Sequence, residues 1–279
     1  LYPASTASNI GTWAQRVAQD WLVLQLTGSG TYVGLVVGLQ FLPALLLSMQ
    51  GGKLADRFNK RRTLIICNIS GGLSAAILGT LVVTEQVKLW HVFFFAFTLG
   101  TASAIDAPVR QSFTAEIVGK ADLPNAVSLN SANFNLARLI GPGLSGLLIA
   151  AFGTGPSFLL NAVSYLFIIT ALLFLRERDM FIENKPNLNA KISEAFRYLK
   201  ARPDIYAVMI TVFFTATFGL NFMLFNTLMT TKVFGKGAAS YGALGSILAI
   251  GSLTGALISA RLEKKRHPSY VMRGSALFG

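Results

Sequence analysis

Long apolar windows, separated by short charged segments, are the feature that most constrains how this chain can fold. Eight of them recur along the 279 residues. Each has about the 20 residues that a helix needs to cross the core of a bilayer. They cover residues 1–26, 31–51, 63–84, 89–109, 125–152, 156–175, 205–230 and 239–260. Charged residues make up only 13% of the chain, whereas soluble domains carry roughly 25%. The sequence therefore predicts an all-α protein that crosses a membrane several times.

Basic residues are distributed unevenly among the segments between these windows. One alternate set of segments carries three Lys and Arg residues, and the other set carries eighteen. The poor set comprises 27–30, 85–88, 153–155 and 231–238, and the rich set comprises 52–62, 110–124, 176–204 and 261–268. Because cytoplasmic loops are enriched in Lys and Arg, we expect the rich set, and with it the N-terminus, to lie in the cytoplasm. This asymmetry accounts for most of the net charge of +12 without nucleic acid as a partner.

The longest polar stretch, residues 176–204, divides the chain into two parts. Six apolar windows precede it, so residues 1–175 are predicted to form a six-helix bundle and residues 205–279 the beginning of a second one. Apolar residues within 176–204 recur at helical spacing among basic ones, which is typical of a short amphipathic helix on the inner membrane surface. A ninth window begins near Ser269 and reaches only Gly279, so we expect eight complete transmembrane helices and part of a ninth.

Three charged residues lie well inside the apolar windows: Arg16 and Asp20 in the first, and Arg138 in the fifth. A charge at the centre of a membrane helix costs roughly 2.5–3.5 kcal/mol, so these side chains should face a cavity or one another. Desolvation favours a neutral carboxyl, whereas a nearby arginine favours the carboxylate. We therefore predict that Asp20 carries a coupling proton and that the two arginines modulate its affinity for that proton. Asp106 is the second candidate for the proton carrier. The alternative is a purely structural network between the first and fifth helices.

The fifth window also carries a polar stripe at helical spacing, made of Ser128, Ser131, Asn135, Arg138, Pro142 and Ser145. Polar side chains are unfavourable in contact with lipid, so we expect this stripe to line a water-filled path together with Gln19 of the first window. In the seventh window, an aromatic stripe that includes Phe218 and Phe222, with Asn221 beside it, could bind lipophilic compounds. The alternative is that the aromatic stripe simply faces lipid.

The segment GGKLADRFNKRRTL, residues 51–64, places one acid among five bases. From Gly52 to Leu64 it resembles the signature loop between helices two and three of the major facilitator superfamily, with Asn59 in place of the second glycine. The stretches NIGTWAQRVAQDWLVLQLTGSG, APVRQSF and LPNAVSLNSANFNLARLIGPGLSG resemble a prokaryotic drug:proton antiporter branch that includes the enterobactin exporters. The resemblance covers essentially the whole chain.

This resemblance implies a twelve-helix major facilitator fold, so the chain would end about four helices early. It also implies a cytoplasmic gate, because the family's loop aspartate sits against the positive end of a helix in the opposite half. Asp56 would be the latch, Lys60 its companion, and Asp106 the partner of Lys60. The predicted gate residues are Gly52, Asp56, Arg57, Lys60, Arg61, Asp106 and Arg110. Ordinary loop polarity is the alternative.

A glycine-rich motif in the fifth window bears on the direction of transport. It comprises Gly141, Pro142, Gly143 and Gly146. The motif resembles the antiporter signature of helix five, which in this family marks exporters, although Ala137 and Ser145 replace two of its glycines. Small residues also let membrane helices pack closely, so general helix packing is the alternative.

The sequence carries no enzyme signature. By the predicted topology its two histidines, His91 and His267, lie at opposite membrane faces and cannot share a metal ion. No phosphate-binding loop ending in Gly-Lys-Ser/Thr occurs, which argues against an ATP-driven pump. The lone Cys67 falls within an apolar window and is expected to be a small buried residue. We predict no cofactor and no metal.

Together these features predict a monomeric secondary transporter of the bacterial cytoplasmic (inner) membrane. It would export amphipathic small molecules, drugs or siderophore-like compounds, in exchange for protons by alternating access. Two alternatives stay open: an importer or lipid flippase of the same fold, and a membrane sensor or scaffold that transports nothing.

Overall fold

The computed structural model describes residues 2–175, 202–214 and 222–261, without the side chains of 48–57, 120, 203–204, 207–208, 222–224, 238, 249, 252–253 and 255–261. Its helices are α1 (Tyr2–Thr27), α2 (Gly30–Arg57), α3 (Lys60–Val83), α4 (Leu89–Phe152), α5 (Gly155–Phe174), α7 (Pro203–Phe214), α8 (Phe222–Leu228), the π-helical turn η3 (Met229–Val233) and α9 (Ala238–Arg261). No strand occurs in these ranges. The predicted windows agree with these bounds to within a few residues, except at 110–124 and at 52–62, where α2 continues to Arg57 and α3 begins at Lys60. Part of the seventh window, residues 215–221, lies outside the described residues.

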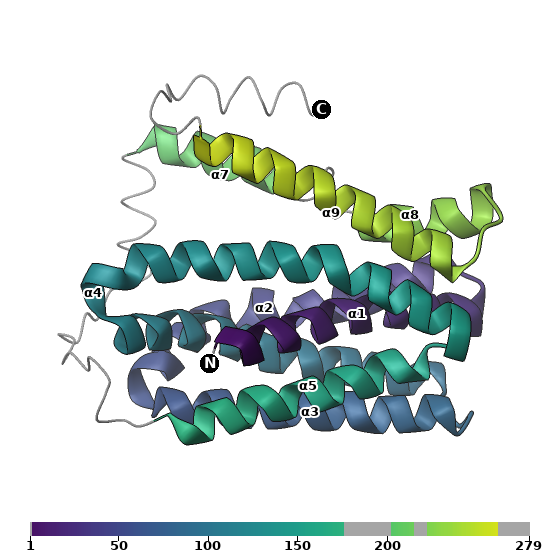
Figure 1. The fold of residues 1–279 in the computed structure, drawn as a ribbon, viewed down its shortest axis with the longest axis horizontal. Helices are drawn as coiled ribbons and strands as arrows, with labels where there is room; N and C mark the ends of the chain where they lie inside the picture. The colour runs from purple at the N-terminus through teal and green to yellow at the C-terminus, as the bar shows by residue number, and fades with distance from the viewer. Residues whose placement is uncertain (1, 176–201, 215–221, 262–279) are drawn as a thin grey trace.

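The helices run back and forth along one axis and are joined at one end by tight connections (Figure 1). We call this the short-loop end; it carries residues 28–29, 84–88, 153–154 and 234–237. The opposite end is marked by Gly119, so we call it the Gly119 end. Because successive helices alternate in direction, residues far apart in the sequence meet at the same depth in the bundle.

Gly119 interrupts α4 and corrects one expectation. The segment 110–124 was expected to be a loop, yet the chain is helical on both sides of Gly119, whose φ of +73° belongs to the left-handed region that favours glycine. The helix continues beyond residue 110 because Val109 and Phe113 are buried in the core beneath it. The polar residues between them made the segment resemble a loop.

Local signals fix where two of the helices begin. The Asn59 side chain accepts a hydrogen bond of 3.0 Å from the backbone N–H of Arg62 and so caps α3. At the start of α4, the backbone N–H of Lys88 donates to Nδ1 of His91 at 2.9 Å. His91, which was considered only as a metal ligand, therefore has a structural role in the described chain.

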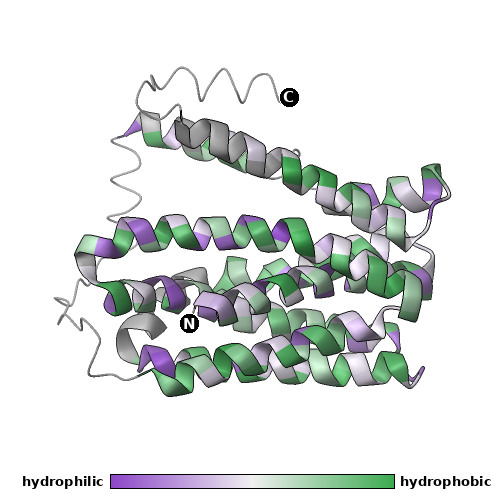
Figure 2. Ribbon diagram, viewed as in Figure 1, coloured by the Kyte–Doolittle hydropathy of each residue, from purple (hydrophilic) through white to green (hydrophobic). Residues whose placement is uncertain are grey.

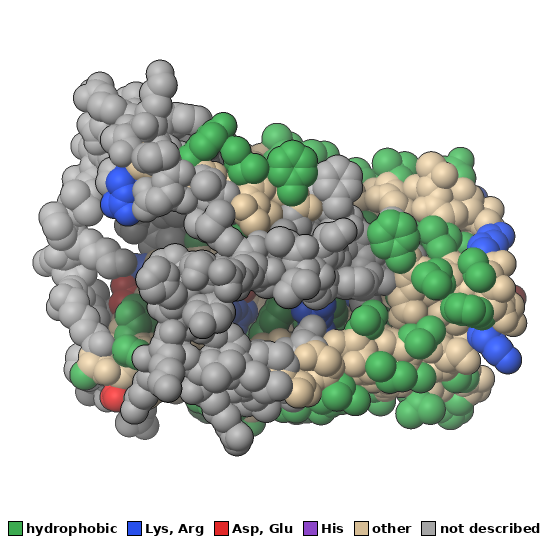
Figure 3. Space-filling model, turned by 90° about the horizontal axis from the view of Figure 1, so that it is seen from above, with side chains coloured by type: hydrophobic (Ala, Val, Ile, Leu, Met, Phe, Trp, Pro, Cys, Tyr) green, Lys and Arg blue, Asp and Glu red, His purple; other side chains and the backbone are tan. Residues whose placement is uncertain are grey.

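Five segments of the described chain are long and apolar enough to cross a membrane: Gly30–Leu47, Lys60–Val83, Leu89–Gly119, Ala121–Phe152 and Gly155–Phe174. Hydrophobic residues run along all of the helices, while hydrophilic ones recur on the stretch of α4 after the kink (Figure 2). Large hydrophobic side chains point outward, among them Leu147 at 67% exposed and Phe174 at 81%. Seen from above, the described surface is mostly apolar or uncharged between its ends (Figure 3). A bilayer is the solvent that suits such a surface.

Helix α1 is not among these five apolar segments because it carries many polar residues, and it lies inside the bundle. Its residues from Ala14 to Leu24 are buried except Arg16 and Trp21, which are partly buried. Close approaches hold the neighbouring helices together. A Cβ on Gly11 would lie 2.6 Å from Oδ1 of Asn161 in α5. Gly100 of α4 likewise lies directly against the backbone of Gln40 in α2.

The contacts of α8 and α9 with the first five helices are concentrated at the short-loop end. A Cβ on Gly242 of α9 would lie 2.8 Å from Cα of Gly146, and a Cβ on Gly30 of α2 would lie 2.6 Å from Leu228 of α8. The Ser246 hydroxyl donates a 3.1 Å hydrogen bond to the Leu139 carbonyl. Toward the Gly119 end, α9 and α4 diverge (Figure 1).

Candidate transport path and gate

Asp20 lies at the junction between the first five helices and α9. Its side chain is only 5% exposed, which is unusual for an acidic residue. The neighbouring Trp21 stacks on Tyr241 of α9, with ring centroids 5.9 Å apart. The Tyr241 hydroxyl faces Asp20 closely enough to interact electrostatically, yet it is buried without a well-aligned hydrogen bond. This loose contact gives the buried carboxyl a neighbour on a separate helix.

Arg16 and Arg138 lie around one aromatic ring. The guanidinium carbon of Arg16 is 5.0 Å from the Trp13 ring centroid, and that of Arg138 is 5.8 Å from the same ring. Such cation–π contacts are worth about 0.5–2 kcal/mol. Among the described residues, neither arginine forms an ion pair with Asp20. The three predicted coupling residues therefore lie in one region but are not joined by direct salt bridges.

The residues predicted to line the path are not gathered at one place. Gln19 is 1% exposed and its Nε2 has no hydrogen-bond partner. Ser131 is exposed and Asn135 is partly buried on α4, where the Asn135 amide donates to the Ser131 carbonyl at 2.9 Å. The predictions for Phe218, Asn221 and the Phe222 side chain lie outside the described residues. Phe214 and Phe225, which continue this aromatic stripe at spacings of four and three residues, are exposed.

A cavity of about 350 Å³ opens between α1, α2 and the first part of α4. Its polar lining consists of Thr12, Arg16, Gln40, Ser103 and Gln111. Phe41, Leu99 and Pro108 contribute apolar walls. Among the predicted site residues that the structure describes, only Arg16 lines this cavity, so the sequence predicted its positive charge but not the residues around it.

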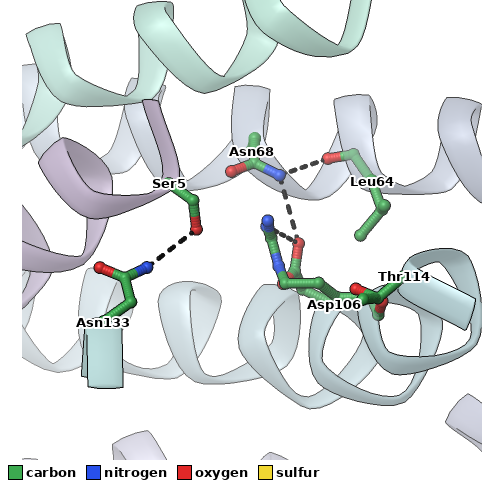
Figure 4. Close-up of polar contacts among 7 residues, drawn as sticks. Ser5, Leu64, Asn68, Asp106, Thr114 and Asn133 are labelled. Carbon is green, nitrogen blue, oxygen red and sulfur yellow. Dashed lines mark hydrogen bonds and ion pairs between the residues drawn. The ribbon is translucent and has the colours of Figure 1, made fainter. Parts of the chain in front are cut away.

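Two ion pairs among the described gate residues correct one expectation. Lys60 was expected to pair with Asp106, but its Nζ lies 2.7 Å from Oε1 of Glu116. Asp106 instead binds Arg110, one turn later in α4, through contacts of 2.7 and 2.8 Å. The Asn68 amide also donates to Asp106 at 3.2 Å (Figure 4). Asp106 is thereby already satisfied, and Glu116 is the acid within reach of Lys60.

Of the other predicted gate residues, Arg61 contacts the end of α5, and those in α2 have side chains outside the described residues. Arg61 donates from Nε to the Leu172 carbonyl at 2.7 Å and from Nη2 to the Leu173 carbonyl, so it caps the end of α5. The backbone of α2 includes Gly52, Asp56 and Arg57, but the predictions for their side chains lie outside the described residues.

The glycine motif of α4 lies in two interfaces. Gly141 faces α1, where a Cβ would lie 2.5 Å from the Trp13 Cβ. Gly143 faces α9, where a Cβ would lie 2.9 Å from the Ser246 hydroxyl. Pro142 and Gly146 pack against Gly242 of α9. The motif therefore provides close helix packing, as the structural alternative expects, and it does so where α4 contacts α9.

Sequence reasoning missed several polar residues, of which Glu116 and Tyr241 contact the predicted site residues Lys60 and Asp20. Tyr241 and Glu116 come from elements far along the chain, and no local pattern marks them. Asn133 is 1% exposed and donates to the Ser5 hydroxyl at 3.3 Å (Figure 4). The sequence did contain a signal for Asn133, because it is a polar residue of the fifth window that does not belong to the predicted stripe. The buried pair of Asn161 and Gln15, 2.6 Å apart, likewise lies in two apolar windows.

Comparisons with known proteins agree with this architecture. The chain is 26% identical over 256 residues to the staphyloferrin A transporter of Staphylococcus aureus, a match that covers 91% of this chain and 64% of the relative. It is 23% identical over 254 residues to the enterobactin exporter EntS of Salmonella typhi, covering 91% and 58%. The chain thus spans roughly three fifths of these relatives.

A solved structure shares the fold. It is a bacterial homologue of the human lysosomal transporter Spinster, in an inward-facing and unoccupied conformation, with a TM-score of 0.70 and 18% identity over 94% of this chain and 61% of that one. The model of a family described as transmembrane secretion effectors matches residues 1–278. These relatives are membrane transporters and not enzymes. The chain therefore belongs to the transmembrane secretion effector family of the major facilitator superfamily.

Proposed function

We propose that this protein is a proton-coupled exporter of amphipathic, siderophore-like small molecules in the bacterial inner membrane. The observation that carries the proposal is the position of Asp20, a buried carboxyl on α1 that faces Tyr241 of α9. A buried acid in a membrane helix marks an ion pathway more often than a structural contact. Residues 1–175 and 205–279 would belong to two bundles joined by 176–204, with the N-terminus in the cytoplasm.

Alternating access would couple the proton to bundle motion. The halves are packed together at the short-loop end, by Gly242 against Gly146, and diverge at the Gly119 end. If the Gly119 end faces the cytoplasm, this arrangement is open to the inside. Opening the short-loop end would separate Tyr241 from Asp20 and expose the carboxyl to water from the other side. The surroundings of the carboxyl, and hence its affinity for a proton, would change with each cycle.

The gate would act at the Gly119 end. Asp56 would latch the cytoplasmic side shut in the outward-open state, with Arg57 and Gly52 in the same loop. Lys60 would support it through Glu116, and Asp106 would hold Arg110 in place. The glycine motif supports export, because the resemblance associates it with antiporters. The relative EntS is an enterobactin exporter, which supports the same direction of transport for this protein.

The test is proton-driven transport by the protein produced from its complete gene. Everted membrane vesicles carrying wild-type protein should take up an amphipathic siderophore when a proton gradient is imposed, and an uncoupler should abolish uptake. Asp20→Asn should abolish gradient-driven uptake while leaving substrate binding in place. Asp122→Asn, the same change at an exposed position, is the matched control. Unchanged uptake in Asp20→Asn would reject Asp20 as the carrier, and uptake only in right-side-out vesicles would identify an importer.

A further inference from the structure

Arg16 has no ion-pair partner among the described residues, although the Asp20 carboxyl, four residues later in α1, is close enough to interact with it electrostatically. Arg16 is partly buried in α1, yet it makes no ion pair and no hydrogen bond with any residue that the structure describes. Its contacts are with two aromatic rings, Trp13 at 5.0 Å and Phe41 at 5.8 Å. A guanidinium carries five N–H donors, and aromatic faces satisfy its charge but not these donors. An arginine held this way inside a membrane protein is poised for an anion.

The cavity beside Arg16 has further unpaired polar groups. The amides of Gln40 and Gln111 line it, and neither makes a hydrogen bond within the described chain. None of the described lining residues is acidic, so Arg16 is the only charged group among them. Phe41, Leu99 and Pro108 supply an apolar wall, and the Phe41 ring lies next to the cation. The lining therefore combines one positive charge, amide donors and a surface suited to a ring.

We propose that this cavity is a subsite for an anionic aryl group, such as the aryl carboxylate arm of a larger amphipathic substrate. Its guanidinium and amide donors would bind the anion, and Phe41 would contact the ring. A volume of about 350 Å³ lies at the small end of ligand pockets, which fits one arm of a substrate rather than a whole siderophore. The proposal rests on the proposed function only in taking the ligand to be a transport substrate.

Binding, measured without transport, tests the subsite separately from export. The probes are naphthalene-2-carboxylate and naphthalene-2-carboxamide, which have the same ring and nearly the same size but differ in charge at pH 7. Equilibrium dialysis of purified protein in a neutral detergent gives both affinities, corrected for uptake by protein-free micelles. We expect the carboxylate to bind about tenfold more tightly than the carboxamide, as a charge-assisted hydrogen bond would give.

Variants connect this preference to Arg16. Arg16→Gln should remove the preference for the carboxylate while keeping carboxamide binding, which also proves that the variant is folded. Arg16→Lys should keep part of the preference, and Arg62→Gln, which removes a charge at an exposed site, should keep all of it. Ser103→Trp, which fills the cavity from its α4 wall, should weaken both probes. Equal affinities in wild type, or a preference that survives Arg16→Gln, would overturn the proposal.

Anionic lipid is another source of the same chemistry. Adding phosphatidylglycerol to the detergent should leave carboxylate binding unchanged if the subsite serves a soluble substrate. Displacement of the probe by phosphatidylglycerol in wild type would identify a lipid headgroup site and overturn the assignment to substrate. Equilibrium dialysis involves no proton gradient, so a failure of gradient-driven uptake in vesicles is distinguishable from a failure of this subsite.

Discussion

Gly141 of α4 lies against Trp13 of α1 so closely that a Cβ at position 141 would be 2.5 Å from the Trp13 Cβ. This contact fixes the depth at which the indole ring sits between the two helices. The ring in turn contacts Arg16, Arg138 and Phe134, the last in an edge-on arrangement with centroids 5.5 Å apart. A glycine that sequence reasoning linked to antiport therefore also positions both arginines of the predicted coupling site.

Replacing Gly141 with Ala should destabilise the protein. The new methyl group would overlap Trp13 and the backbone of Ala14, and such overpacking costs about 1–3 kcal/mol. Unfolding in mixed micelles, followed by tryptophan fluorescence, measures the loss. Gly38→Ala is the matched control, because nothing lies within 4 Å of a Cβ there and alanine suits a helix better than glycine. Equal stability of the two variants would contradict the observed contact.

A cysteine pair should lock the short-loop end. A Cβ on Gly143 would lie 2.9 Å from the Ser246 hydroxyl, close to the roughly 3 Å between a Cβ and the far sulfur of a disulfide. In a Cys67→Ser background, which removes the one cysteine of these 279 residues, Gly143→Cys with Ser246→Cys should cross-link on oxidation. Mild reduction should reverse the cross-link.

Transport should respond to that cross-link. If the halves must separate at the short-loop end in each cycle, the oxidised pair should stop transport and the reduced pair should regain it. Each single cysteine variant, treated with the same oxidant, is the control. Full transport by a cross-linked protein would show that this end need not open.

The pair formed by Lys60 and Glu116 should be energetically coupled, and Lys60 and Asp106 should not be. The first two side chains are 2.7 Å apart and about 15% exposed, so removing both charges should cost less than the sum of the single losses. A double-mutant cycle with Lys60→Gln and Glu116→Gln should give a coupling of about 0.5–1 kcal/mol. The parallel cycle with Asp106→Asn should give a value near zero. A larger coupling energy for Lys60 and Asp106 than for Lys60 and Glu116 would support the pairing expected from the sequence instead.

Much of the fold was predictable because membrane helices are set by hydropathy. The windows at 63–84 and 156–175 agree with α3 and α5 to within a few residues. The prediction of a loop at 110–124 was wrong for a physical reason. Polar residues there lie on a helix whose other face buries Phe113, and hydropathy averaged over a window cannot separate the two faces.

Less of the site was predictable. Helical spacing correctly placed Arg16 and Asp20 on one helix within the bundle, but spacing does not decide which partner a long side chain selects. Arg16 turns toward Phe41 of α2, and Lys60 toward Glu116. These choices depend on how α2, α4 and α9 pack around α1, which is information that no local pattern contains.

Asn161 of α5 should matter more for stability than Asn135 of α4, although both are amides in membrane helices. The Asn161 amide donates to Gln15 at 2.6 Å and its oxygen accepts from Ser164 at 2.9 Å, all in the buried interface with α1. Asn161→Ala would leave the Gln15 oxygen buried without a partner, at a cost of about 1–2 kcal/mol. Asn135 is partly buried, and among the described residues it donates only to the Ser131 carbonyl of its own helix, so Asn135→Ala should change stability by less than about 0.5 kcal/mol. Unfolding in mixed micelles compares the two variants, and a loss in Asn135→Ala as large as that in Asn161→Ala would contradict the α1–α5 packing described above.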